Sequence, residues 1–174
     1  MRILKYPNAL LRADNEAITV FDEQLSSTVS EMFKVMYASN GLGLSAPQVG
    51  INKRLMVLNE SGDRKEVLKE RVFINPRIMS RSKETCVRSE GCLSFPSIEA
   101  ELERFQTVDV EFDCLPLGAR GSASLSGIEA QIFQHEYDHL NGRLFIDLFD
   151  EWDTQEYARL LNYRRERYGP SGKA

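Results

Sequence analysis

The sequence predicts an α+β protein, in which a helix, several strands, a second helix and a terminal helix follow one another. Three observations predict it. Apolar residues recur at helical spacing near the N-terminus, short apolar or alternating runs bounded by turn residues fill the middle, and two further helical patterns follow. The 174 residues suit one domain, or one domain and a tail.

Composition excludes several classes of protein. With 28% charged and 42% hydrophobic residues, the chain is neither collagen-like nor disordered. A net charge of -4 argues against a dedicated nucleic-acid binder, and no apolar run approaches the roughly 20 residues of a membrane helix. We therefore expect no membrane partner. The three cysteines are an odd number, which favours a reducing compartment.

The first predicted helix spans residues 22–39. Its apolar residues are spaced by three and four, which marks the buried face of an amphipathic helix. Asp22 is a candidate N-cap, and Asn40 and Gly41 supply the stop. Four strands are expected after it, at residues 55–58, 72–75, 107–114 and 121–125.

The second predicted helix begins after Ser126, which with Glu129 forms a capping-box pattern. Four of its residues share one face: Ile128, Ile132, His135 and His139. A last helix is expected at residues 154–168, before a Gly- and Pro-containing tail.

The only two histidines of the chain lie in the sequence His135-Glu136-Tyr137-Asp138-His139, an H-E-x-x-H motif. Four residues apart on a helix, both imidazoles can reach one metal ion, while Glu136 can act on a nearby water. The pattern arises by accident in roughly one chain in a thousand of this composition. The alternative is a pair of histidines that pack inside a helix without a metal.

A catalytic metal usually has three protein ligands, so one more is expected. The acids Asp147, Asp150 and Glu151 follow the motif, but no pattern singles one out. Among the cysteines, Cys92 is the better candidate, because Gly91 and a following proline place it in a bent segment. A lone cysteine is more often a small buried apolar residue, and the incomplete histidine site favours Cys92 as a ligand.

A glycine-rich segment at residues 41–50 lacks the features of a phosphate loop. Considered by itself, this segment is predicted to be a turn. It contains Gln48, whose neutral amide can donate a hydrogen bond to an oxyanion without competing for a metal.

Three segments together resemble the signature motifs of peptide deformylases, in the same order: residues 41–48, 90–94 and 134–140. The resemblance covers about residues 1–150 and is closer to the type 1B plant and organelle branch than to the common bacterial one. It implies antiparallel β-sheets around a central metal-binding helix. It also implies a catalytic domain at 1–150, and we expect a C-terminal helix and flexible tail at 151–174. The implied activity is removal of the N-formyl group from the initiator methionine of nascent polypeptides.

The resemblance also assigns residues to roles. One divalent metal, Fe(II) in the cell and often Zn, Ni or Co in preparations, would be held by Cys92, His135 and His139. Glu136 would be the general acid and base, and Gln48 and the Leu93 N–H would hold the oxyanion. An arginine of many bacterial members is replaced by Glu99, so Arg104 is considered in its place. The substrate-binding set is therefore Gly43, Leu44, Ile128, Ile132 and Arg104.

Partners and location follow less directly. The basic end of the chain, residues 159–173, could contact the ribosome, or it could simply complement the helix dipole. The location would be cytoplasmic in a bacterium or virus, and a plastid or mitochondrion for a trimmed eukaryotic chain. Two other functions are considered, a metalloprotease and a non-catalytic domain that binds peptides or holds an inert metal.

Overall fold

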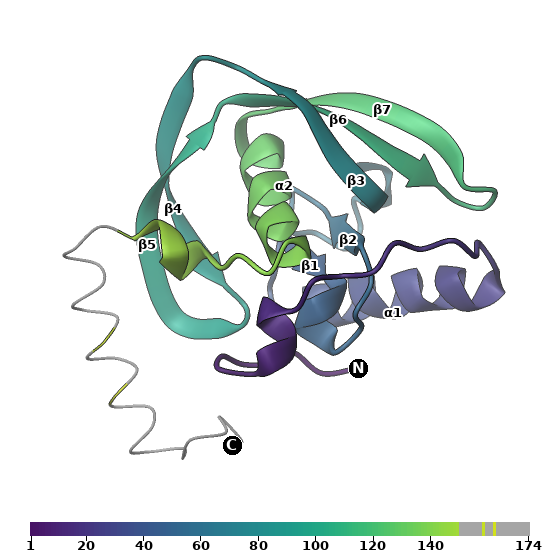
Figure 1. The fold of residues 1–174 in the computed structure, drawn as a ribbon, viewed down its shortest axis with the longest axis horizontal. Helices are drawn as coiled ribbons and strands as arrows, with labels where there is room; N and C mark the ends of the chain where they lie inside the picture. Colours follow the sequence, from purple (N-terminus) through teal and green to yellow (C-terminus); the bar gives the residue numbers. More distant parts are fainter. Residues whose placement is uncertain (150–157, 159–161, 163–174) are drawn as a thin grey trace.

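The computed structural model describes residues 1–149, 158 and 162. Two antiparallel sheets flank the helix α2 (Gly127–Leu140), as Figure 1 shows. The larger sheet has the strand order β1-β2-β3-β6-β7, and β4 and β5 form a separate hairpin. The α+β prediction with antiparallel sheets around a helix is confirmed. The helix expected at 154–168 lies outside the described residues.

The strands have the following bounds: β1 (Gly43–Ser45), β2 (Leu55–Leu58), β3 (Arg71–Arg81), β4 (Thr85–Cys92), β5 (Phe95–Phe105), β6 (Thr107–Cys114) and β7 (Ala119–Ser126). All four predicted strands are present. β2 and β6 have the predicted bounds, while β3 and β7 are longer than the sequence pattern indicated.

Strands β1, β4 and β5 were not predicted. The glycine-rich segment, expected to be a turn, instead forms the edge strand β1 and the short 3₁₀ helix η2 (Ala46–Val49). Three more 3₁₀ helices complete the described part: η1 (Ala9–Arg12), η3 (Val67–Lys69) and η4 (Phe145–Leu148).

Helix α1 (Glu23–Ala38) follows the sequence prediction closely. The Asp22 side chain accepts a hydrogen bond from the Leu25 N–H at 2.8 Å, which satisfies one of the free donors at the helix start. Helix α2 also begins after Ser126, but the predicted capping box is wrong. The Ser126 side chain forms no capping hydrogen bond, and Glu129 pairs with Arg71 at 3.0 Å instead.

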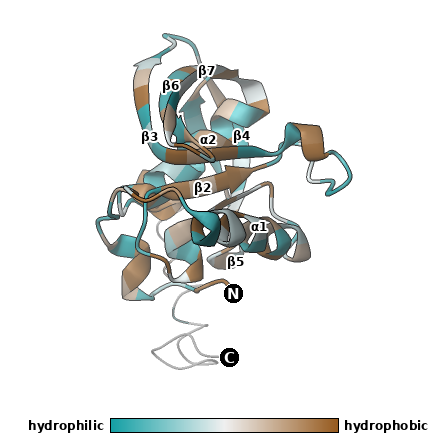
Figure 2. Cartoon of the chain, turned by 90° about the vertical axis from the view of Figure 1, so that its right-hand side faces the viewer, coloured by the Kyte–Doolittle hydropathy of each residue, from teal (hydrophilic) through white to brown (hydrophobic). Residues whose placement is uncertain are grey.

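Buried apolar residues form three clusters that place the second helix. One lies between α1 and strands β1 and β2, and another between α2 and the large sheet, where Phe133 packs against Phe73. The third fills the β4–β5 hairpin and includes Cys92 and Phe95. Strand β2, hydrophobic along its length in Figure 2, is buried throughout. Helix α2 is thus fixed from the large sheet on one side and faces the hairpin on the other.

Within the part of the chain that the structure describes, no helix is both long and apolar enough to cross a bilayer.

Candidate metal centre

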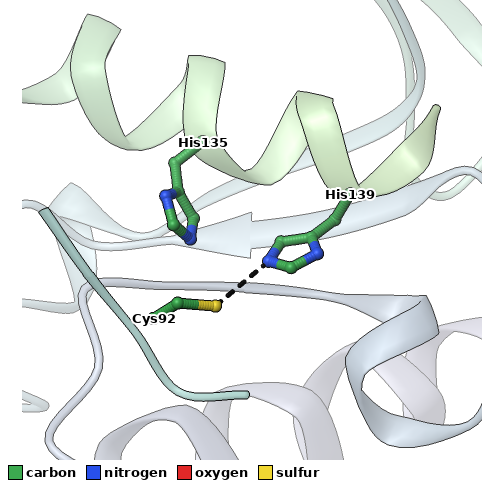
Figure 3. Close-up of side chains that lie close together, drawn as sticks. All are labelled: Cys92, His135 and His139. Carbon is green, nitrogen blue, oxygen red and sulfur yellow. Dashed lines mark hydrogen bonds between the residues drawn. The ribbon is translucent and has the colours of Figure 1, made fainter. Parts of the chain in front are cut away.

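Three buried side chains from two elements converge on one point. His135 and His139 lie one turn apart on α2, and Cys92 is the last residue of β4. Their ligand atoms all lie within 4.8 Å of one another, and Cys92 Sγ is 3.3 Å from His139 Nε2. Figure 3 shows the sulfur facing both imidazoles. From the sequence these three residues were separate candidates, and the β4–β5 hairpin brings the cysteine to the helix.

The donor set fits a divalent transition metal. Thiolate and imidazole ligands suit zinc and iron, and two such ligands on one tetrahedral ion lie roughly 3.5 Å apart. The 3.3 Å separation of Cys92 Sγ and His139 Nε2 matches this spacing. Burial lowers the pKa of His139 well below its ordinary value, which favours the neutral imidazole that binds metals. A metal would also explain why a thiol and two imidazoles are buried together.

A chain of ion pairs orients His135. The Glu90 carboxylate accepts a hydrogen bond from His135 Nδ1 at 2.9 Å, so Nε2 is left to face Cys92. Arg104 donates to both oxygens of Glu90, at 2.8 and 2.9 Å, and to Asp138 at 2.6 Å. Although burial raises the pKa of Glu90, the bonds from His135 and Arg104 outweigh it and lower that pKa to about 2. Glu90 is therefore a permanent carboxylate behind the imidazole.

Gln48 is held beside the cysteine with its amide orientation fixed. Its Oε1 accepts hydrogen bonds from the Ser45 N–H and Oγ, both at 2.9 Å. Its Nε2 group therefore points the other way, toward Cys92 Sγ at 3.6 Å and Ser94 Oγ at 3.4 Å. The buried amide thus directs its donor group toward Cys92 of the candidate metal centre and toward Ser94 beside it.

Glu136 is a buried carboxylate with spare bonding capacity. Its Oε2 has no hydrogen-bond partner among the described residues. Burial raises its pKa to about 7, so it can both take up and release a proton near neutral pH. It faces Gly43, where an added Cβ would lie 2.8 Å from Glu136 Oε1 and 2.7 Å from Ile132 Cγ2. Only glycine leaves the carboxylate in place.

A cavity of about 500 Å³ opens onto these residues. It is bounded by residues 39–43, the β4–β5 hairpin and one face of α2. Four residues that the sequence analysis assigned to substrate or oxyanion binding line it: Gly43, Leu93, Ile128 and Ile132.

The structure does not bring Leu44 and Arg104 to this cavity. The Leu44 side chain is fully buried in the core against α1, so only its backbone could reach a ligand. The assignment of Arg104 to substrate is corrected, because its guanidinium is 7% exposed and occupied by Glu90 and Asp138. Of the acidic alternatives for the third ligand, Asp147 pairs with Arg12, and residues 150 and 151 lie outside the described residues.

Sequence reasoning missed the roles of Glu90 and Ser45. Each lies within three residues of an identified site residue, Glu90 two before Cys92 and Ser45 three before Gln48. A signal was available for Glu90, since a metal-binding histidine usually donates its second N–H to a carboxylate or carbonyl.

Comparison with known proteins agrees with the resemblance noted in the sequence. The family model described as Polypeptide deformylase matches residues 1–155. The chain is 50% identical over 168 residues to "Peptide deformylase 1B, chloroplastic/mitochondrial" of Arabidopsis thaliana, covering 97% of this chain. The crystal structure of peptide deformylase 1B from that plant with an inhibitor has a TM-score of 0.91 at 44% identity, covering 99% of this chain and 94% of that one. A Plasmodium falciparum peptide deformylase also has a TM-score of 0.91, at 43% identity, covering 96% of each chain.

The chain spans only part of its curated plant relatives. It covers 61% of the Arabidopsis protein, 54% of a rice relative and 52% of a tomato relative, all three named peptide deformylase 1B.

Proposed function

The chain belongs to the polypeptide deformylase family, and on this premise we propose that it removes the N-formyl group from the N-terminal methionine of newly synthesised polypeptides. The observation that carries the proposal is the convergence of Cys92, His135 and His139 beside the carboxylate of Glu136 at one cavity. The proposed catalytic domain is residues 1–150.

The proposed resident metal is Fe(II), which Zn, Ni or Co can replace in preparations. Cys92, His135 and His139 would hold it, and it would supply a Lewis acid that polarises a carbonyl and lowers the pKa of a water.

The residues of the chain carry out the proton transfers and hold the developing charge. Glu136 accepts a proton from the attacking water and delivers it to the leaving amine, which its pKa of about 7 permits. The Gln48 amide and the Leu93 N–H donate to the oxyanion that forms on the formyl oxygen. The bonds from Ser45 hold the amide in the donating orientation before substrate arrives, and losing one such donor typically costs on the order of 10²–10³ in rate.

The cavity has room for a methionine side chain beside the buried carboxylate of Glu136. Gly43 lets the backbone of β1 approach this carboxylate closely, because an added Cβ there would lie 2.8 Å from Glu136 Oε1. Beyond it, Ile132 and the half-exposed Ile128 offer an apolar wall for the flexible methionine side chain.

Two further parts of the proposal concern the setting of the enzyme. A plastid or mitochondrial location is supported by the names of the plant relatives. Weak contact with ribosomal RNA is supported by the basic residues near the end of the chain, and binding to ribosomes that moderate salt abolishes is the expected observation. These basic residues are Arg159, Arg164, Arg165, Arg167 and Lys173.

The test is turnover of a formyl-Met tripeptide by protein loaded anaerobically with Fe(II). Glu136→Gln should lower kcat by about 10²–10⁴ with metal content near one per chain. Glu129→Gln, the same change on the same helix but paired with Arg71 outside the cavity, should retain activity. Wild-type protein that holds metal but leaves the formyl group intact would overturn the proposal, and cleavage of internal peptide bonds would then favour a protease.

A further inference from the structure

The segment that precedes η1 reaches both residues that the proposed function assigns to the oxyanion. The Leu4 N–H donates to the Gln48 carbonyl at 2.7 Å. The next residue, Lys5, donates from Nζ to the Leu93 carbonyl at 2.6 Å and lines the cavity beside the candidate metal centre. Two neighbouring residues thus contact both proposed oxyanion donors, which come from segments far apart in the sequence.

The same segment also joins two of the apolar clusters. Ile3 packs against the cluster between α1 and the strands β1 and β2, whereas Leu4 and Tyr6 pack against the cluster of the β4–β5 hairpin. Tyr6 stacks on Phe95 of β5 with ring centroids 5.0 Å apart, and its N–H donates to the Ser94 carbonyl at 3.1 Å. Residues 3–6 are therefore fixed to the large-sheet side and to the hairpin at once.

Lys5 holds Leu93 at a point that the strands do not hold. Leu93 and Ser94 form the turn between β4, which ends at Cys92, and β5. The N–H and the carbonyl of a residue are joined through one Cα, and the backbone has only two soft dihedral angles per residue. Holding the Leu93 carbonyl therefore restricts the rotations through which its N–H could turn away. The donor is an ammonium group, so the hydrogen bond is stronger than one between neutral groups.

We propose that Lys5 is a positioning residue for the reaction, which holds the Leu93 carbonyl so that the Leu93 N–H stays directed at the oxyanion. The inference rests on the proposed function and adds a residue to it. Because the oxyanion forms only in the transition state, loss of this support should lower kcat and leave KM unchanged. Deleting an oxyanion donor outright costs on the order of 10²–10³ in rate, so misdirecting one should cost about tenfold.

The experiment compares two variants of Lys5 with wild type in turnover of a formyl-Met tripeptide by protein loaded anaerobically with Fe(II). Lys5→Met keeps an apolar stem without the donor and should lower kcat about tenfold at unchanged KM and metal content. Lys5→Arg keeps a charged donor and should restore most of that loss. The matched control is Lys53→Met, the same change at a lysine that pairs with Glu16 outside the cavity, and it should leave kcat and KM unchanged.

A second measurement needs no turnover. In Zn(II)-loaded protein with isotope-labelled leucine, the NMR order parameter of the Leu93 amide should be about 0.85, as in rigid backbone, and should fall in Lys5→Met. The amide of Leu102, in β5 of the same hairpin, should stay rigid in both proteins.

Failure of this inference is distinct from failure of the proposed function. If wild type deformylates the peptide but Lys5→Met keeps its kcat, raises KM alone or leaves the Leu93 amide rigid, the positioning role of Lys5 is wrong. A kcat that Lys5→Arg does not restore would also overturn it. If wild type does not turn over the peptide, the proposed reaction is wrong instead, and the order parameter still decides whether Lys5 fixes Leu93.

Discussion

Replacing Arg104 with methionine tests whether the buried ion pairs hold the metal helix in place. The guanidinium is 7% exposed and is bound by Glu90 and Asp138, whose side chains are 5% and 16% exposed. Methionine keeps an unbranched apolar stem but leaves both carboxylates without a counter-charge. Breaking a buried pair in this way typically costs about 3–5 kcal/mol. For a domain of this size, that corresponds to a fall in Tm of roughly 6–20 °C.

The effect should reach the metal through His135. Glu90 holds the Nδ1 of this imidazole, and changes to such outer partners typically cost about 10–100-fold in metal affinity. We expect Arg104→Met to weaken Co(II) binding by that factor, measured by titration against a competing chelator. Arg104→Lys keeps the charge but loses the bidentate geometry, so an intermediate loss is expected.

The assay for stability is thermal unfolding in the presence of a chelator, so that metal loss does not contribute. The matched control is Arg71→Met, which breaks the partly exposed pair with Glu129 and should cost no more than about 1 kcal/mol. A triple variant that also carries Glu90→Gln and Asp138→Asn should regain stability but not metal affinity. If Arg104→Met melted within 2 °C of wild type, the reasoning about this buried network would be refuted.

Three further predictions concern the site and its surroundings. Gly43→Ala should displace the Glu136 carboxylate and lower kcat/KM for a formyl-Met tripeptide at least about 10-fold at unchanged metal content, and near-normal kinetics would contradict this. Burial raises the pKa of Asp147, but the hydrogen bond from Arg12 outweighs it and lowers the pKa below 3.8. The stabilisation by this pair is therefore complete above pH 3.8 and is lost as pH falls through the folded-state pKa. Asp147→Asn should lower the free energy of unfolding in urea by about 1 kcal/mol at pH 6, and by progressively less below pH 3.8. A difference between wild type and variant that stayed the same at every pH would exclude this cause. Fe(II)-loaded protein should lose activity in air because the Cys92 thiolate and the iron are both open to oxidation, and full activity after aerobic storage would refute it.

The strands that sequence analysis missed show what local patterns can and cannot report. Strand β5 carries a clear signal, since Ile98, Ala100 and Leu102 are buried and alternate with exposed glutamates. Strand β4 carries none: of its eight residues, only Glu90 and Cys92 are buried. It pairs with β5 alone, and its buried positions serve the candidate metal centre rather than an apolar core.

The corrected assignment of Arg104 follows from the same period-two pattern. In β5 it continues the buried series of Ile98, Ala100 and Leu102, so its side chain points inward with them. A buried guanidinium needs a carboxylate, and Glu90 and Asp138 supply two.

The capping box predicted at Ser126 is absent for a different reason. Glu129 had a partner 58 residues away, Arg71, which no local pattern contains.

The candidate site depends on α2 being held along its whole length. Near its start, Glu129 pairs with Arg71 of β3, and in its last turn Asp138 pairs with Arg104 of β5. At its end, the Leu140 carbonyl, which has no partner within the helix, accepts hydrogen bonds from Arg54 and Asn15, both at 3.2 Å.

These anchors come from both sheets and from the N-terminal segment, so the helix cannot shift toward one sheet without breaking contacts to the other. Cys92 lies on the hairpin that also carries Arg104, and Gln48 lies in the 3₁₀ helix next to β1 of the large sheet. The distance between the thiol and the two imidazoles is therefore set by how the two sheets enclose α2. A site held this way is organised before metal or substrate binds, which is the condition under which fixed donors such as the Gln48 amide lower a barrier.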